Sequence, residues 1–217
     1  MGLTTILFDL QGVYFYYRPG QPVLENCHFR LHPGEKVALT GANGSGKTTL
    51  FHLMVGLIKP KVGKVVAFGR PRVTEKDFRE VRARAGILFQ DTDDQLFCPT
   101  VRDDIAFGPL NLGKGIEEAE ALVQQTLAML AMESYASRIT HRLSGGEKRL
   151  VALATVLAMQ PEVLLLDEPS NALDPKAEAR LLEILTSLPQ AMVIISHQTS
   201  FIEQIATRRV ELIQGRL

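Results

Sequence analysis

The sequence has few cysteines, and they lack the spacing of a metal site or a disulfide framework. Cys27 and Cys98 are the only two in 217 residues, and neither belongs to a CxxC or Cys/His pattern. This argues against a zinc site and against a secreted, disulfide-rich fold. We expect both cysteines to be buried free thiols.

The sequence also lacks a long apolar run, a leader segment and an excess of charge of one sign. No stretch approaches the roughly 20 apolar residues of a membrane-spanning helix, and Asp9 interrupts an N-terminus that has no cationic start. Lys plus Arg equals Asp plus Glu, at 24 each, which argues against nucleic acid as the main partner and predicts no strongly basic surface. We expect one soluble, cytosolic domain over residues 1–217, so any membrane role needs a separate partner.

The sequence does contain enough apolar residues, 46%, to bury a substantial core. Short apolar segments predict strands of a parallel sheet that is buried on both faces, at residues 36–40, 86–89, 163–166 and 193–196. Helical patterns lie between these strands, at residues 47–55, 116–131, 147–159 and 176–188. Strands that alternate with helices indicate an α/β fold.

Two further regions differ from this alternation. Val13, Phe15 and Tyr17 alternate with other residues before a Pro19-Gly20 turn, and a second strand-like segment follows at 23–31, which predicts an antiparallel hairpin. Residues 91–161 contain no convincing strand and at least two helical patterns. We therefore expect a helical lobe there, beside the sheet.

The segment after the strand at 36–40 matches the phosphate-binding loop pattern GxxxxGK[ST]. It reads Gly41-Ala42-Asn43-Gly44-Ser45-Gly46-Lys47-Thr48, is followed by Thr49, and opens a helix. The glycines let the backbone turn so that its amides can bind phosphate oxygens, and the helix N-terminus adds partial positive charge. ATP and Mg²⁺ are the expected ligands, with Lys47 on the β- and γ-phosphates and the Thr48 hydroxyl on the metal ion.

Two adjacent acids, Asp167 and Glu168, follow the strand at 163–166, at the sheet edge where open α/β folds bind ligands. Adjacent residues of an extended chain point to opposite sides. We therefore expect Asp167 to hold Mg²⁺ and Glu168 to accept a proton from the attacking water.

A second anion site is expected where Ser144 and Glu147 have the spacing of a capping box, at the start of the helix near residue 147. Taken with the phosphate loop and the acid pair, Leu143-Ser144-Gly145-Gly146-Glu147 resembles the signature sequence of ABC ATPases. The resemblance implies a P-loop NTPase fold with a mainly parallel RecA-like sheet core, an N-terminal antiparallel β subdomain and an inserted helical subdomain over roughly residues 91–161.

The resemblance also implies roles for residues beyond the first motifs. Gln90 resembles the Q-loop glutamine, a catalytic residue and Mg²⁺ ligand, and His197 resembles the switch histidine. The D-loop corresponds to Ser170-Asn171-Ala172-Leu173-Asp174. Tyr17 resembles the aromatic that stacks on adenine, although Tyr14 and Tyr16 compete for that role and core packing is an alternative for Tyr17. A head-to-tail dimer is implied, in which the signature binds the neighbour's ATP.

The stretch from Gln90 to Gly113, with its DDQ and FGPLNLG runs, looks like the ATPases of energy-coupling factor (ECF) importers, including cobalt and nickel systems. This implies a second ATPase subunit, a transmembrane coupling subunit and a membrane subunit that captures the solute, which would be cobalt, nickel or a vitamin such as biotin. The chain would lie peripherally on the cytoplasmic face of the membrane. Many ATPases of that subgroup carry a further C-terminal extension, whereas this sequence ends at Leu217.

Two other functions are compatible with parts of the sequence. A soluble ABC ATPase of DNA repair, translation or cofactor assembly would share the motifs, but it often has a coiled-coil insertion, a second ATPase or basic surfaces. A regulatory nucleotide-binding module without turnover would not need both Glu168 and His197.

Overall fold

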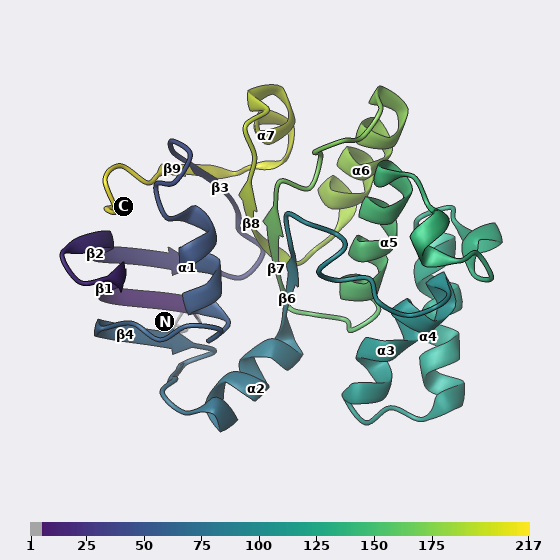
Figure 1. The fold of residues 1–217 in the computed structure, drawn as a ribbon, viewed down its shortest axis with the longest axis horizontal. Helices are drawn as coiled ribbons and strands as arrows, with labels where there is room; N and C mark the ends of the chain where they lie inside the picture. Colours follow the sequence, from purple (N-terminus) through teal and green to yellow (C-terminus); the bar gives the residue numbers. More distant parts are fainter. Residues whose placement is uncertain (1–5) are drawn as a thin grey trace, which may run out of the picture.

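The computed structural model describes residues 6–217 and contains two sheets with helices around them (Figure 1). The smaller sheet is antiparallel, with strand order β2-β1-β4-β5. Its strands are β1 (Phe8–Arg18), β2 (Gln21–Leu31), β4 (Val62–Ala67) and β5 (Arg70–Pro71). The predicted hairpin is therefore confirmed as β1 and β2, and β4 and β5 add two strands that the sequence pattern did not indicate.

The larger sheet is parallel and has the strand order β6-β7-β8-β3-β9. Its strands are β3 (Lys36–Thr40), β6 (Ala85–Leu88), β7 (Val163–Asp167), β8 (Ala191–Ile195) and β9 (Arg208–Glu211). The four predicted strands are confirmed, and β9 is a fifth, at the edge beside β3. The mixed α/β class with a mainly parallel core sheet is thus confirmed.

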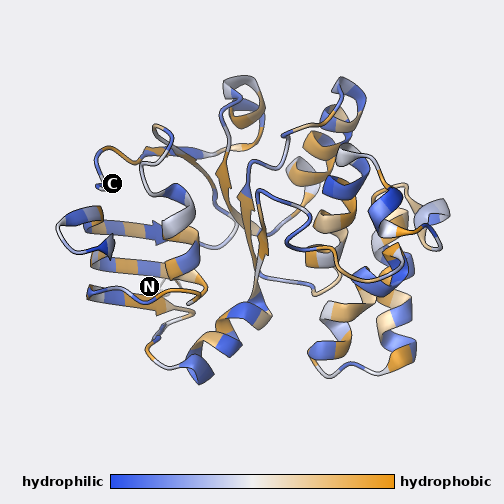
Figure 2. Cartoon of the chain, in the orientation of Figure 1, coloured by the Kyte–Doolittle hydropathy of each residue, from blue (hydrophilic) through white to orange (hydrophobic). Residues whose placement is uncertain are grey.

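Both faces of the parallel sheet are buried, because successive side chains of a strand point to opposite faces. On β7, Val163 and Leu165 join the apolar cluster shared with the antiparallel sheet, whereas Leu164 and Leu166 join the cluster formed with the helical lobe. Because each strand contributes side chains to both cores, the strands of this sheet are continuously apolar, as Figure 2 shows.

The helices divide between the same two cores. The helices are α1 (Lys47–Met54), α2 (Glu75–Arg84), α3 (Val101–Asn111), α4 (Ile116–Met129), α5 (Gly145–Leu157), α6 (Pro175–Ser187) and α7 (Thr199–Ile205), with 3₁₀ turns at Glu133–Tyr135 and Thr140–Arg142. The apolar residues that α1 and α2 contribute to a core belong to the first cluster, and those that α3 to α7 contribute belong to the second. Residues 91–161 hold α3, α4 and α5, which pack together to the right of the sheet in Figure 1.

The two cysteines differ in burial, which corrects the expectation that both are buried. Cys27 is buried in the antiparallel sheet, and Cys98 is only half-buried. The pKa of both thiols is raised to about 11, mainly by burial, and at Cys98 the carboxylate of Asp104 contributes to the rise.

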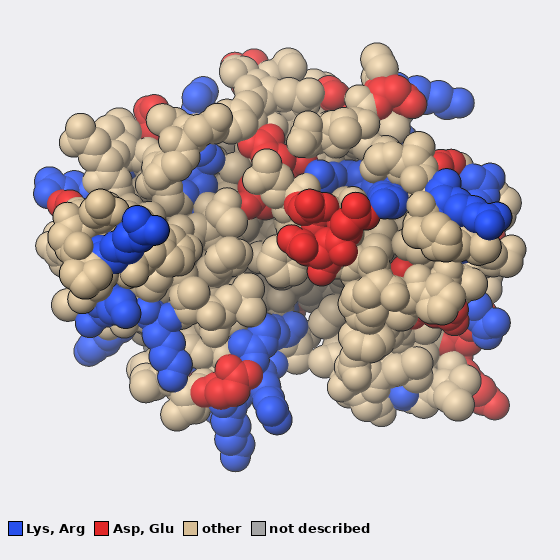
Figure 3. Space-filling view, viewed as in Figure 1, with Lys and Arg blue, Asp and Glu red and all other residues tan. Residues whose placement is uncertain are grey.

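No helix within residues 6–217 is both long and apolar enough to cross a bilayer. Charge is distributed unevenly over the surface, although the chain is neutral. Figure 3 shows Lys and Arg gathered over β4 and α2, and acids gathered near the loop that follows β6. Apart from the buried Arg72, the stretch 59–84 includes Lys59, Lys61, Lys64, Arg70, Lys76, Arg79, Arg82 and Arg84 against Glu75, Asp77 and Glu80. A locally basic surface therefore exists, contrary to the expectation from net charge.

Candidate functional site

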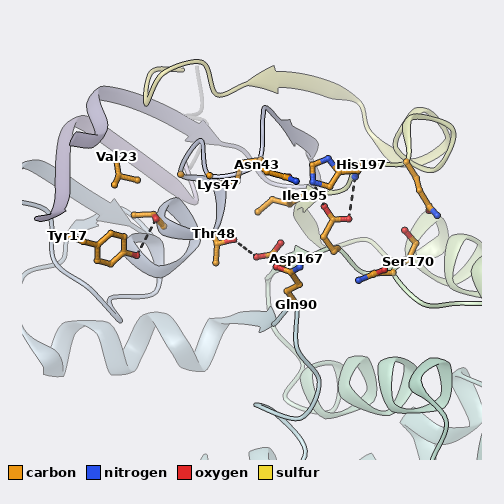
Figure 4. A pocket seen from close by; sticks show the side chains of 16 residues that line it. Tyr17, Val23, Asn43, Lys47, Thr48, Gln90, Asp167, Ser170, Ile195 and His197 are labelled. Carbon is orange, nitrogen blue, oxygen red and sulfur yellow. Dashed lines mark hydrogen bonds and ion pairs between the residues drawn. The ribbon is translucent and has the colours of Figure 1, made fainter. Parts of the chain in front are cut away.

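A cleft of about 710 Å³ lies where β3, β7 and β8 end, which is where the sequence places its motifs (Figure 4). It is lined by Tyr17, Val23, Asn43, Gly44, Gly46, Lys47, Thr48, Thr49, Gln90, Asp167, Glu168, Ser170, Asn171, Ile195, His197 and Gln198. The structure therefore brings together the phosphate loop, the acid pair, Gln90, His197 and Tyr17, which are up to about 180 residues apart in the sequence.

The phosphate loop has the backbone that its glycines predict. Gly41, Gly44 and Gly46 have φ angles of 141°, 75° and 106°, a region that side chains with a Cβ rarely adopt. Lys47 Nζ donates to the carbonyl oxygens of Gly41 at 2.9 Å and Ala42 at 3.0 Å, so its ammonium lies across the loop. The Ser45 hydroxyl is buried without a hydrogen-bond partner among the described residues. An unpartnered donor in a glycine cradle fits a phosphate oxygen.

Asp167 ends β7 and meets the phosphate-loop helix. The Thr48 hydroxyl donates to Asp167 Oδ2 at 2.7 Å, and Gln90 lies on the same wall of the cleft. Burial raises the pKa of the Asp167 carboxyl, although the Thr48 hydroxyl and Lys47 counteract this. Hydroxyl, carboxylate and amide oxygens are the ligands that Mg²⁺ prefers. These residues therefore fit the metal ion, with substrate phosphates completing its ligands.

Glu168 diverges from Asp167 for a reason that the sequence did not indicate. The pair is not extended as expected, because Glu168 itself has a left-handed φ of 49°. This backbone conformation turns its side chain away from that of Asp167. Its Oε2 accepts from the His197 backbone N–H at 3.4 Å, and its Oε1 lies 3.3 Å from His197 Nε2 without a hydrogen bond. Burial raises the pKa of Glu168, and the nearby His197 opposes that rise.

The opposite end of the cleft is formed by Tyr17 and Val23 (Figure 4). Tyr17 is 62% exposed, and its hydroxyl lies 3.3 Å from Thr49 Oγ1. Val13 and Phe15 are buried, so they pack in the core, whereas the exposed Tyr17 does not follow them. Register shifts interrupt the β1–β2 pairing between Val13 and Arg18, and this breaks the alternation that would have placed all three side chains on one buried face. Of the three competing tyrosines, only Tyr17 lines the cleft.

The signature residues do not line this cleft. Ser144 caps α5 in a complete capping box: Glu147 N–H donates to Ser144 Oγ at 3.3 Å, and Ser144 N–H donates to Glu147 Oε2 at 2.8 Å. Leu143 is buried, whereas Ser144 and Gly145 are exposed. The capped helix therefore presents its N-terminus to solvent, where a second molecule can reach it.

The predicted D-loop lies between the cleft and the signature. Ser170 and Asn171 line the cleft, and Asn171 and Ala172 line an adjoining cavity of about 510 Å³ together with Gly145. Leu173 packs against the apolar cluster of the helical lobe, and Asp174 caps α6 by accepting from Ala177 N–H at 2.8 Å. Its C-terminal end thus has structural contacts, and its first three residues face the site.

Sequence reasoning missed several residues near the site. Val23, Ile195 and Gln198 line the cleft, and no local motif indicates them. Arg149 is buried beneath the loop that carries Gln90. A cation two residues after the signature, within an otherwise apolar helix face, is the signal that could have indicated it.

Known proteins resemble this chain over most of its length. A family model described as ABC transporter matches residues 24–171. A protein of Brucella suis biovar 1 that is named as an ABC transporter ATP-binding protein is 54% identical over 92% of this chain and 83% of its own length. The energy-coupling factor transporter ATP-binding protein EcfA of Methanothermobacter thermautotrophicus is 41% identical over 97% of this chain and 69% of its own length.

Two solved structures show the same similarity in three dimensions. CbiO1 from Clostridium perfringens, part of the ABC transporter complex CbiONQ, has a TM-score of 0.87 and 31% identity, and the match covers 98% of this chain and 86% of CbiO1. A dimeric ATP-binding cassette in a post-hydrolysis state, bound to ADP and Pi, has a TM-score of 0.88 and 25% identity, and the match covers 97% of this chain and 96% of that cassette.

Proposed function

Because this chain belongs to the ABC transporter family as an ATP-binding subunit, we propose that it hydrolyses ATP for an ECF-type importer of a transition-metal ion (cobalt or nickel) or a vitamin. The similarity to EcfA and to CbiO1 supports the importer type. The observation that carries the proposal is the position of Glu168 and His197 in one cleft with the phosphate loop.

ATP binds with its adenine at the Tyr17 and Val23 end of the cleft and its phosphates in the glycine loop. Lys47 turns from the loop carbonyls to the β- and γ-phosphates, and the Ser45 hydroxyl gains a partner. Thr48, Gln90 and Asp167 would hold Mg²⁺, which neutralises phosphate charge and orients the γ-phosphate.

Hydrolysis places a water between Glu168 and the γ-phosphorus. Glu168 accepts the water proton while the new oxygen–phosphorus bond forms and the bond to the β,γ-bridging oxygen breaks, which gives ADP and Pi. The raised pKa of Glu168 makes it a better proton acceptor than an exposed carboxylate. His197 holds the water and the γ-phosphate in line.

The exposed N-terminus of α5 supports a head-to-tail dimer in which Ser144 and the Gly146 amide bind the neighbour's γ-phosphate. Charge-assisted hydrogen bonds contribute about 1.5–3 kcal/mol each. Moving a two-state equilibrium from 1:99 to 99:1 takes about 5.5 kcal/mol. Two such sites, with two or three bonds each, are therefore sufficient to close the dimer, and loss of the γ-phosphate opens it.

An apolar groove beside Gln90 is the proposed docking site of the transmembrane coupling subunit. The groove has a volume of about 290 Å³ and is lined mainly by apolar side chains, which include Leu57, Phe89, Phe97 and Phe107. Phe97 is 63% exposed and Phe107 46% exposed, so docking of a partner would bury the apolar surface of both rings. Docking there would hold the chain at the cytoplasmic face of the membrane.

A phosphate-release assay tests the proposed base. Glu168→Gln should lower kcat by about 10²–10⁴-fold while ATP still binds, because only proton acceptance is lost. Glu178→Gln, on α6 outside the cleft, is the matched control. Hydrolysis at the normal rate by the Glu168→Gln protein would contradict the assigned base.

Co-purification from detergent-solubilised membranes tests the transporter assignment. A hydrophobic membrane subunit should be recovered with the tagged chain, and Phe97→Asp should abolish its recovery. Identifying the recovered subunits would also indicate the solute. Recovery of soluble partners alone would favour the soluble ABC ATPase alternative.

A further inference from the structure

The loop that follows β6 is held against α5 by several side chains. Arg149 Nη1 donates to the Phe89 carbonyl at 2.8 Å, and Arg149 Nη2 donates to the Gln90 carbonyl at 2.6 Å. At the preceding position of the same helix, Lys148 forms an ion pair with Asp93 at 2.5 Å. The loop that carries Gln90 is therefore tied to the helix that carries the signature.

Arg149 makes these bonds from a buried position. Its residue exposure is 5%, and no carboxylate forms an ion pair with it among the described residues. A buried cation without an ionic partner is costly unless its donors are used. Two of its donors are used on consecutive carbonyls, so those two peptide groups are held in one orientation.

Gln95 ties the same loop to α5 from the other direction. Its Nε2 donates to the Ala152 carbonyl and to Thr155 Oγ1, both at 2.8 Å, and its Oε1 accepts from Phe89 N–H at 3.3 Å. Phe89 is thus bonded at its carbonyl oxygen to Arg149 and at its N–H to Gln95. The DDQ run has a physical role here, because Asp93 and Gln95 both contact α5.

The tie spans two functional positions. Gln90 lines the nucleotide cleft, and Ser144 caps the exposed start of α5 four residues before Lys148 and five before Arg149. A single helix transmits displacement along its length because its backbone hydrogen bonds are continuous. A shift at Gln90 must therefore move Ser144 or break the bonds of Arg149 and Gln95.

We propose that Arg149 and Gln95 are positioning residues that join the loop of Gln90 to the signature helix, so that the contents of one cleft set the position of the Ser144 offered to the neighbouring subunit. This rests on the proposed ATP-dependent dimer. Neither residue lines the nucleotide cleft, so we expect their effect to pass through Ser144. Coupling between two sites typically changes affinity by roughly 5–150-fold.

The test uses the full chain with Glu168→Gln, which holds ATP unhydrolysed. Dimerisation with Mg-ATP is measured by analytical ultracentrifugation, and binding of a fluorescent ATP analogue is measured separately at concentrations where the chain is monomeric. Arg149→Met and Gln95→Leu should each weaken ATP-dependent dimerisation by at least about fivefold. At a temperature where each variant is folded, analogue binding should match that of the controls Arg102→Met and Gln124→Leu, whose side chains pair with Glu120 in the same lobe.

Arg149→Lys supplies the conservative comparison, because its ammonium can still donate to these carbonyls, and it should restore part of the dimerisation. If Arg149→Met does not fold, Gln95→Leu decides. Unchanged dimerisation, or equal losses of analogue binding and dimerisation, would overturn the proposal. A Glu168→Gln parent that does not dimerise with ATP would instead count against the proposed function.

Discussion

At the scale of single residues, the site depends on conformations that ordinary side chains avoid. Glu168 is left-handed at φ 49° and its side chain is only 13% exposed. A non-glycine residue in this region costs on the order of 1–3 kcal/mol and persists where the surroundings impose it. The strain is offset by a gain in function, because the turn aims Glu168 at His197 and away from Asp167.

The strain predicts a difference between two inactive variants. Glu168→Gly should be more stable than Glu168→Gln, with an unfolding free energy higher by up to about 1 kcal/mol and a correspondingly higher melting temperature. The reason is that glycine adopts this φ without strain. Both variants lack the carboxylate, and the glycine variant also loses the rest of a largely buried side chain, so a higher stability despite that loss identifies the backbone strain. Thermal unfolding measures it, and a Glu168→Gly protein that is the less stable of the two would contradict the strain.

The two cysteines predict slow reaction with thiol reagents in the native state. With the pKa of both Cys27 and Cys98 raised to about 11, few thiolates exist at pH 8. Cys98 is half-buried and should react first, and Cys27 should react only as fast as the β1–β2 sheet opens. Timed labelling with mass spectrometry distinguishes them, and equal rates for both would contradict the different burial.

At the scale of elements, sequence patterns predicted those parts whose residues carry their own signals. The capping box of Ser144 and Glu147 placed the start of α5, and the apolar runs placed β3, β6, β7 and β8. In contrast, α2 buries only Phe78 and Val81 and is otherwise largely charged, so its apolar pattern is too short to indicate a helix clearly. Strand β4 depends on pairing with β1, and β5 depends on pairing with β4, and no local pattern encodes either pairing.

The candidate site divides in the same way. Lys47, Asp167 and Ser144 belong to contiguous motifs, which the sequence alone is enough to indicate. Val23 lines the cleft because β2 passes the phosphate loop, and Glu168 has its left-handed φ because of its surroundings. Such features arise from tertiary packing, so sequence spacing alone could not give them.

The N-terminal cap of α2 predicts a pH dependence. Hydrogen bonds from Thr74 and Val73 lower the pKa of Asp77 to about 2. A carboxylate whose folded pKa is depressed stabilises the fold above its unfolded value of 3.8, and this contribution is lost as pH falls toward 2. The melting temperature of Asp77→Asn should therefore lie below that of the natural chain at pH 7, with a smaller gap at pH 3. A gap that widens toward pH 3 would contradict the cap.

Packing between β6 and α5 predicts a pair of compensating substitutions. A Cβ at Gly86 would lie 2.2 Å from Val156 Cγ1, so Gly86→Ala should destabilise by roughly 1–3 kcal/mol. Val156→Ala removes the clashing atom while losing some buried surface. Denaturant unfolding of the double variant should show a loss smaller than the sum of the two single losses, and additive losses would contradict this close approach.

At the scale of the whole molecule, two apolar cores lie on opposite faces of one sheet, and the nucleotide cleft lies at its edge. A ligand that binds only the folded state stabilises it by about 2.7 kcal/mol at a hundred times its Kd. For a chain of this size each kcal/mol raises the melting temperature by about 2–4 °C.

Saturating Mg-ATP should therefore raise the melting temperature of the Glu168→Gln chain by about 5–10 °C. EDTA should reduce the shift, because Thr48 and Asp167 then bind no metal ion, and Lys47→Ala should nearly remove it. Differential scanning fluorimetry measures all three. An equal shift in the Lys47→Ala protein would place nucleotide elsewhere.

The two hydrogen bonds from Lys47 to the carbonyls of Gly41 and Ala42 set a threshold for ligands. An incoming anion must first replace interactions that the loop already supplies to its own lysine. A weakly charged anion gains little binding energy when it replaces these hydrogen bonds. A polyphosphate compensates for their loss, because it contacts Lys47 and several loop amides at once. The hydrogen bonds between Lys47 and the loop carbonyls therefore also help the site to discriminate against the abundant small anions of the cell.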